Sequence, residues 1–231
     1  LVGWWRFSEN SGQFANDSST WGNNLTLGST IGVDSEDPSW NSSGKFGSAL
    51  IFDGADDRLQ INSNPSFNTS RFTIEAWINM NFSGPPTDFS TIIKKDNQYI
   101  LRFYNLDGCL YGLMWNSTLS SVKSNNCALN NSKWHYLVYS YNGSHHSLYI
   151  NGILDNSASK TGTLAFSPDI LTVGSSSSGA EEFYSFIDEV KIWKRALSPQ
   201  EINASFNAGI YRLENNFTNL SLGNYTFSAH V

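Results

Sequence analysis

The chain has 231 residues, of which 39% are hydrophobic and 15% are charged, and it contains eight Trp, fifteen Phe and ten Tyr. This aromatic content is enough to fill a large core and excludes a disordered chain, which would be poor in Trp and Phe. The formal net charge is −6 and Lys and Arg form no run, which argues against a nucleic-acid partner because phosphate binding needs clustered cations.

The start of the chain already resembles folded structure. Residues 1–5, Leu-Val-Gly-Trp-Trp, have the composition of a strand, and no initiator Met or signal-peptide pattern precedes them. We expect that a leader was removed or that the chain is a piece of a longer protein. No stretch approaches the roughly 18 apolar residues of a membrane span.

Apolar residues then alternate with polar residues along most of the chain, with turn residues between the runs. In residues 72–79 the alternation places Phe72, Ile74, Ala76 and Ile78 on one face. Asn-Gly pairs at 142–143 and 151–152 predict tight hairpins. About twelve strands and no intervening helix predict an all-β fold, two antiparallel sheets packed as a sandwich or jelly roll. The predicted strands are 1–5, 49–53, 58–61, 72–79, 90–94, 99–104, 110–115, 134–141, 145–150, 153–154, 170–173 and 184–194.

One short helix is predicted near the end of the sandwich. Ser198-Pro199-Gln200-Glu201 supplies an N-cap, a Pro at the first helical position and a capping-box Glu. Ile202 and Phe206 lie four residues apart and therefore share a face, and we expect Gly209 to end the helix.

The two cysteines, Cys109 and Cys127, flank a predicted hairpin. In an antiparallel hairpin opposed residues have a constant index sum, and a turn centred on Thr118 gives 236, the sum for this pair. The sulfurs would then face each other at disulfide distance, which fits an oxidising compartment. Two buried free thiols are the alternative.

Twelve Asn-x-Ser/Thr acceptor sites predict N-linked glycans and an extracellular or cell-surface location. Some of these sites follow from an Asn- and Ser-rich loop composition alone, but twelve exceeds that expectation. The acceptor residues are Asn16, Asn24, Asn41, Asn68, Asn81, Asn116, Asn130, Asn142, Asn203, Asn216, Asn219 and Asn224.

The last twenty residues differ from the rest. We divide the chain into a sandwich domain, 1–211, and a C-terminal tail, 212–231, whose end alternates as a strand. An unpaired strand favours addition to a sheet edge. The tail could pair with its own sandwich, begin a following domain, or join a neighbouring copy of the chain.

Several segments together resemble the laminin-G-like modules of the concanavalin A-like lectin/glucanase superfamily. They are VGWWRFSENSG, NDSSTWGNNLTL, KFGSALIFDGADDRLQI, FTIEAWI, WHYLVYSYNG, LYINGIL and FIDEVKIWKRALSPQEI, in family order over roughly residues 2 to 206. The resemblance implies a two-sheet jelly roll and an extracellular module that binds glycans or proteins, frequently with calcium. The fold alone does not fix the function.

The resemblance also implies a calcium site. Glu9, Asp17 and Asp188 stand at family positions where an ion commonly joins the first loop to the last strand, and Asn23 could add a carbonyl oxygen. The Gly-Asn-Gly of relatives is replaced here by Trp21-Gly22-Asn23-Asn24, which changes the loop. The alternative is turn chemistry, in which these side chains accept backbone N–H groups.

A second acidic group, Asp53, Asp56 and Asp57, could hold another cation or accept sugar hydroxyls. A tight Asp-Gly turn with solvated neighbours is the favoured interpretation.

Loop tryptophans are the candidates for stacking on a sugar ring, because a pyranose face packs well on an indole. Trp21 and Trp40 lie in predicted loops and Trp115 adjoins the predicted hairpin turn. Packing beneath a long loop is the alternative. His145 and His146 are adjacent and point to opposite faces, so we expect a solvated hairpin and not a metal site.

The sequence argues against an enzyme. Glucanases of this superfamily place carboxylates at alternate positions of one strand, whereas Asp188 and Glu189 are adjacent. We therefore expect a non-catalytic recognition or adhesion module that binds a glycan or a surface protein. A structural subunit of an extracellular filament or surface layer, assembling through the C-terminal strand, is the alternative.

Overall fold

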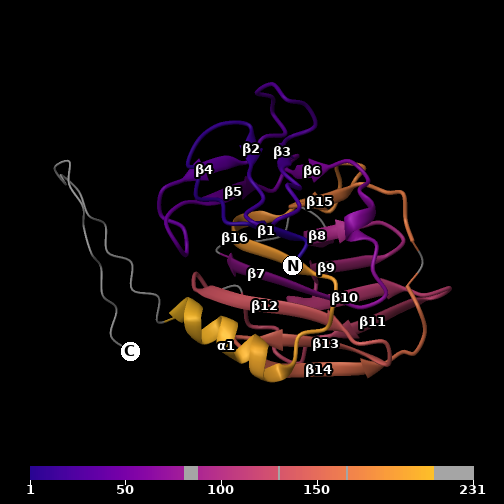
Figure 1. Ribbon diagram of the computed structural model, residues 1–231. Helices are drawn as coiled ribbons and strands as arrows, with labels where there is room; N and C mark the ends of the chain where they lie inside the picture. The colour runs from indigo at the N-terminus through magenta and orange to yellow at the C-terminus, as the bar shows by residue number, and fades with distance from the viewer. Residues whose placement is uncertain (81–87, 130, 165, 211–231) are drawn as a thin grey trace, which may run out of the picture.

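The computed structural model describes residues 1–80, 88–129, 131–164 and 166–210, which form two antiparallel sheets of eight strands each (Figure 1). The two-sheet jelly-roll sandwich expected from the alternation is confirmed. The described residues contain sixteen strands and not twelve. The additional strands are two or three residues long or, in one case, mostly polar, so their alternation is too weak to detect.

Sheet A is ordered β14-β13-β12-β7-β16-β5-β4, and β1 pairs with the end of β16. Its strands are β14 (Ile153–Ser159), β13 (His145–Ile150), β12 (Trp134–Tyr141), β7 (Phe72–Asn79), β16 (Tyr184–Trp193), β5 (Ala49–Asp53), β4 (Ser39–Asn41) and β1 (Gly3–Trp5).

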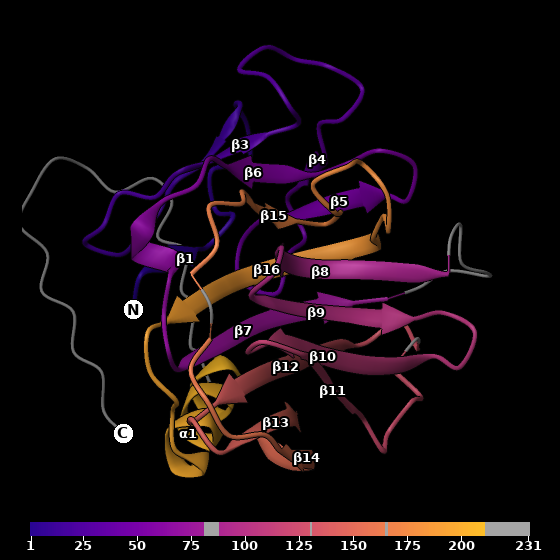
Figure 2. The ribbon, with the colours of Figure 1, turned by 90° about the vertical axis from the view of Figure 1, so that its right-hand side faces the viewer.

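Sheet B is ordered β11-β10-β9-β8-β15-β6-β3-β2, and Figure 2 shows most of its strands one below another. Its strands are β11 (Leu119–Lys123), β10 (Cys109–Trp115), β9 (Tyr99–Tyr104), β8 (Phe89–Lys95), β15 (Leu171–Val173), β6 (Leu59–Ile61), β3 (Leu25–Leu27) and β2 (Phe14–Ala15). A 3-10 turn, η1 (Pro65–Phe67), precedes β7.

The main core fills the space between the sheets. Phe72, Ile74, Ala76 and Ile78 of β7 all lie in it, as the alternation predicted. Trp77, which points the other way, belongs to a second apolar cluster on the outer face of sheet A. Each sheet therefore has one face in the core and one outer face.

The helix α1 (Pro199–Ile210) covers the second cluster on the outer face of sheet A (Figure 1). Its Phe206 ring stacks on Trp77 with the centroids 5.8 Å apart. The prediction that Gly209 ends the helix is wrong, because Gly209 lies within α1. A Cβ on Gly209 would come within 2.6 Å of the Trp77 ring, so this glycine permits close packing of the helix on the sheet.

The disulfide between Cys109 and Cys127 is present, but the predicted hairpin register is wrong. Strand β10 pairs with β11 so that Trp115 opposes Leu119, which gives an index sum of 234. Cys127 therefore lies beyond the end of β11, and the loop that follows this strand brings its sulfur back to the start of β10.

His145 and His146 point to opposite faces, as expected, but the expectation that both are solvated is wrong. His146 is fully buried, and its ring nitrogens share hydrogen bonds with the Tyr139 hydroxyl at 3.0 Å and the Ser120 hydroxyl at 3.1 Å. Burial lowers the pKa of His146 to about 4, so the ring is neutral and helps to join the two sheets.

The predicted C-terminal strand lies outside the described residues, which end at Ile210, as does the boundary at residue 211. Within the described part of the chain, no helix has the length and apolar character needed to cross a membrane.

Candidate functional site

The outer face of sheet B carries a row of polar and aromatic side chains that are in register across four strands. Thr91 of β8 opposes Arg102 of β9, Arg102 opposes Tyr111 of β10, and Tyr111 opposes Lys123 of β11. Side chains at opposed positions lie on the same face of a sheet. The hairpin order of these strands thus collects residues from 91 to 123 on one surface.

Aromatic rings form the middle of this surface. The ring centroids of Phe89 and Tyr104 are 5.1 Å apart, and those of Tyr104 and Tyr111 are 6.1 Å apart with an edge-to-face arrangement. The Arg102 guanidinium lies 3.8 Å from the centroid of the Phe89 ring. All four side chains are partly exposed. We call Phe89, Arg102, Tyr104 and Tyr111 the aromatic face.

Charged groups border the aromatic face. The Asp107 carboxylate accepts a hydrogen bond from the Tyr111 hydroxyl at 2.8 Å and pairs with Lys123 at 2.9 Å. Burial, together with the neighbouring Asp107, raises the pKa of the Tyr111 hydroxyl, so it remains a hydrogen-bond donor at neutral pH.

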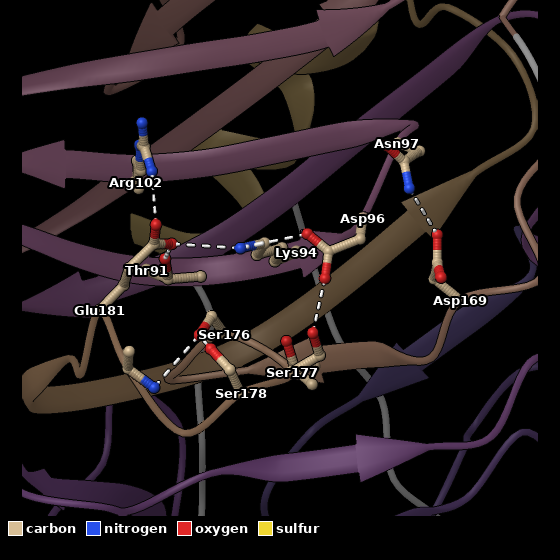
Figure 3. Close-up of polar contacts among 12 residues, drawn as sticks. Thr91, Lys94, Asp96, Asn97, Arg102, Asp169, Ser176, Ser177, Ser178 and Glu181 are labelled. Carbon is tan, nitrogen blue, oxygen red and sulfur yellow. Dashed lines mark hydrogen bonds and ion pairs between the residues drawn. The ribbon is translucent and has the colours of Figure 1, made fainter.

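On the other side of the aromatic face, Glu181 joins three residues of sheet B (Figure 3). Its carboxylate accepts hydrogen bonds from Arg102 Nη1 at 2.8 Å and Thr91 Oγ1 at 3.0 Å, and it pairs with Lys94 Nζ at 3.5 Å. Lys94 also pairs with Asp96 at 3.1 Å. Glu181 therefore neutralises the two cations of this region and fixes the position of Arg102.

Glu181 belongs to the loop 174–183, which connects β15 to β16. The loop is closed by its own backbone, since Phe183 N–H donates to Gly174 O at 2.7 Å, and its Glu181 O accepts from Thr91 N–H at 2.8 Å. Gly174 has a φ of +87°, and a Cβ there would come within 2.0 Å of the Phe52 ring. The loop folds over β15, because Thr172 of this strand points outward and is nevertheless buried. The loop therefore divides the outer face of sheet B into two parts.

The residues predicted to bind calcium are spread over separate hydrogen-bond networks. Asp17 uses both carboxylate oxygens to accept four bonds, from the backbone of Trp4, Ser19 and Asn23 and from the Ser19 hydroxyl. Glu9 accepts from Asn16 N–H at 3.0 Å. The first loop is thus held by turn chemistry.

Asn23 and Asp188 are both buried. Asn23 donates to Val2 O at 2.7 Å, and Asp188 accepts from Phe46 N–H at 3.1 Å. Burial raises the pKa of Asp188 to about 8, partly offset by the bond from the Phe46 N–H. Among the described residues, Glu9, Asp17 and Asp188 do not form a group of carboxylates that one ion can contact, and calcium binding there stays a prediction.

The acidic group that does come together is Asp53, Asp56 and Asp57, whose nearest carboxylate oxygens all lie within 4.8 Å of one another. Asp57 accepts from Asp53 N–H at 2.7 Å and Asp53 accepts from Ala55 N–H at 2.8 Å, which is the expected tight turn. Burial, and then the neighbouring carboxylates, raise the pKa of Asp57 to about 7.

The three candidate tryptophans lie in different places. Trp21 is 52% exposed in the first loop, and Trp40 lies in β4, packed partly against the core. Trp115 ends β10 and, four residues after Tyr111, points to the outer face of sheet B. Of these three tryptophans, only Trp115 therefore shares a surface with the aromatic face. The residues of the aromatic face lie on or beside predicted strands, but the sequence did not identify them as a site.

The acceptor asparagines differ in accessibility. Asn16, Asn24, Asn142 and Asn203 are exposed, and Asn41 and Asn68 are partly exposed. Asn116 is buried and donates its side-chain amide to Thr161 O at 2.7 Å, so a glycan cannot be attached without displacing that contact. The acceptors Asn81, Asn130, Asn216, Asn219 and Asn224 lie outside the described residues.

Comparison with known proteins decides the family. The family model described as "Concanavalin A-like lectin/glucanases superfamily" matches residues 53–203. The chain belongs to this superfamily. No curated protein sequence matches the chain.

Solved structures with the same superfamily fold include several toxin binding domains. The binding domain of Paraclostridial Mosquitocidal Protein 1 matches with a TM-score of 0.72 and 17% identity, covering 91% of this chain and 52% of that one. The receptor binding domain of botulinum neurotoxin mosaic serotype C/D gives 0.69 and 17%, covering 91% and 51%. The binding domain of botulinum neurotoxin DC, in complex with rat synaptotagmin II, gives 0.67 and 16%, covering 91% and 52%. The chain spans about half the length of these structures, and at this identity the likeness establishes the fold.

Proposed function

We propose that the chain is an extracellular, non-catalytic recognition module that binds a glycan or a surface protein through the outer face of sheet B. The observation that carries the proposal is the aromatic face itself. Phe89, Tyr104 and Tyr111 present partly exposed rings next to fixed charged groups. Sites of this composition favour ligands with both apolar and hydrogen-bonding surfaces.

Two further points support the proposal. The solved structures that share the fold are binding domains by their own descriptions, and one of them is in complex with a protein. The Cys109–Cys127 disulfide suits an oxidising compartment, which agrees with a secreted or surface location.

The absence of a catalytic role is part of the proposal. A bulge between Asp188 and Lys191 interrupts the alternation of β16, and Glu189 adopts a φ of 51° there. The Glu189 carboxylate accepts from the Trp4 indole at 2.6 Å, while Asp188 accepts from backbone N–H groups. Both carboxylates therefore serve the fold, which does not favour their use as an acid and nucleophile pair.

The experiment is a glycan array and a surface-protein binding screen with the 231-residue chain and two variants, Tyr104→Ala and Tyr111→Ala. Each variant should weaken binding about tenfold or more, because it removes a ring from the centre of the face. The control is Tyr184→Ala, a tyrosine of sheet A that is 38% exposed. Binding that is equally sensitive to Tyr184→Ala would contradict the assignment to the outer face of sheet B. A chain that binds nothing and assembles into filaments would favour the structural-subunit alternative.

A further inference from the structure

A pocket of about 300 Å³ lies on the other part of the outer face of sheet B, over β3 and β6. Thr26 and Gln60 are opposed across these strands and point outward, since Leu25, Leu27 and Leu59 point into the core. The volume is at the lower end of the range of small-ligand sites, about 300–1,000 Å³.

The polar lining of this pocket consists of amides and hydroxyls. Its polar residues are Asn24, Thr26, Ser29, Thr30, Gln60 and Asn62. None of the described residues that line it carries a charge, although the chain as a whole has a net charge of −6. An ionic ligand would lose its hydration there without a counter-charge, which disfavours it.

Some of these groups build the wall and others are available to a ligand. Gln60 donates to Ser29 O at 3.1 Å, and Thr30 Oγ1 bonds to Gly32 O at 3.0 Å, so both hold the loop that follows β3. Among the described residues, the hydroxyl of Thr26 and the side-chain amide of Asn62 make no hydrogen bond within the protein. Hydroxyl and amide groups both donate and accept, as the hydroxyls of a sugar require.

Two isoleucines complete the pocket. Ile31 is 78% exposed, and Ile61 is partly buried and packs against the core. An exposed aliphatic side chain beside a polar pocket offers a surface for the C–H face of a pyranose. A sugar bound against Ile31 would remove part of this side chain from water, which is favourable.

We propose that this pocket binds a neutral saccharide and is a second site, separate from the aromatic face. The saccharide has two sources with the same chemistry. One is a glycan on Asn24 itself, because Asn24 lines the pocket, is exposed, and begins the acceptor sequence Asn24-Leu25-Thr26. The other is a glycan of a partner.

The test uses the full chain, produced without N-glycosylation in an oxidising compartment and titrated with N,N′-diacetylchitobiose, lactose and cellobiose. At least one should bind, and 3′-sialyllactose should bind no better than lactose. Asn62→Ala and Thr26→Val should each weaken binding about three- to tenfold, since each removes one hydrogen-bonding group. The control Ser63→Ala changes an exposed neighbour outside the lining and should have no effect.

A second arm separates the two sources. In glycosylated protein from a secretory host, a glycan of Asn24 that fills the pocket should resist enzymatic release under native conditions. It should also block whichever saccharide binds the unglycosylated chain. An unmodified Asn24, with binding retained, assigns the pocket to a partner's glycan. The inference is overturned if no neutral saccharide binds the unglycosylated chain, or if binding ignores both pocket variants. Loss of binding in Tyr111→Ala alone would place the sugar on the aromatic face, which contradicts this inference and leaves the proposed function intact.

Discussion

Replacing Glu181 with Gln should weaken the attachment of the loop 174–183 to sheet B. The substitution keeps the size of the side chain, and the left-handed backbone at residue 181, with φ 62°, strains Glu and Gln to a similar extent because neither side chain is branched at Cβ. It removes the charge that Arg102 and Lys94 share, leaving two cations without their common partner. Any effect therefore reports the electrostatic contacts and not packing or backbone strain.

The expected magnitude follows from burial. The side chains of Glu181, Arg102 and Lys94 are 22%, 15% and 13% exposed, so water screens the contacts only partly. Hydrogen bonds to charged groups contribute about 1.5–3 kcal/mol each, and the bond from Thr91 can persist to Gln. We expect a loss of about 2–3 kcal/mol in the free energy of unfolding, which lowers Tm by about 5–10 °C for a domain of this size.

Glu201→Gln is the matched control for this measurement. Glu201 also pairs with an arginine, Arg195, but the two side chains are 44% and 52% exposed, and Gln preserves the capping box. Calorimetry at low and high salt should show a small, salt-sensitive change for Glu201→Gln and a larger change for Glu181→Gln that persists in salt. Equal effects in the two variants, or a Glu181→Gln effect abolished by salt, would refute the reasoning.

Three further predictions concern stability and modification. Removing the disulfide by replacing Cys109 and Cys127 with Ser should cost about 3 kcal/mol in denaturant unfolding, and two alkylatable thiols in the native chain would contradict the bond. Asp57 retains a proton in the folded state up to pH of about 7, whereas the unfolded carboxyl loses it near 3.8, so its contribution to stability is full below pH 3.8 and falls up to pH 7. Asp57→Asn should remove up to about 4 kcal/mol of that pH dependence. Calcium bound by this acidic group should raise Tm more at pH 8 than at pH 5, and an equal rise in Tm at the two pH values argues against calcium there. Glycopeptide mapping of protein from a secretory host should find Asn16 modified and Asn116 unmodified, and a native chain glycosylated at Asn116 would show that its contact with the backbone is dispensable.

The long strands could be predicted from the sequence because alternation and turn chemistry act locally. The predicted ranges of β5, β7, β9, β12 and β13 agree with the structure at both ends. Pairing register is less local: an error of one residue in the position of the β10–β11 turn moved the expected partner of Cys109 by two residues. The cysteines still meet because a loop, and not the ladder, carries Cys127.

The aromatic face could have been found in part, since Arg102, Tyr104 and Tyr111 occupy outward positions of predicted strands. Glu181 gave no such signal. It lies in a loop 79 residues from Arg102, and only the order of β15 beside β8 brings the two together. Asp188 was predicted as a metal ligand from its family position, and this stays a prediction; its burial and its bonds from backbone N–H groups depend on the packing around β16, which the sequence does not reveal.

The most direct test of the account is hydrogen–deuterium exchange of the full chain with and without a ligand found in the binding screen. The account predicts that ligand-dependent protection concentrates in β8, β9, β10 and the loop 174–183, and that Tyr104→Ala reduces this protection at the same ligand concentration. Protection confined to sheet A or to α1, with no change on sheet B, would contradict the assignment of the outer face of sheet B as the binding surface.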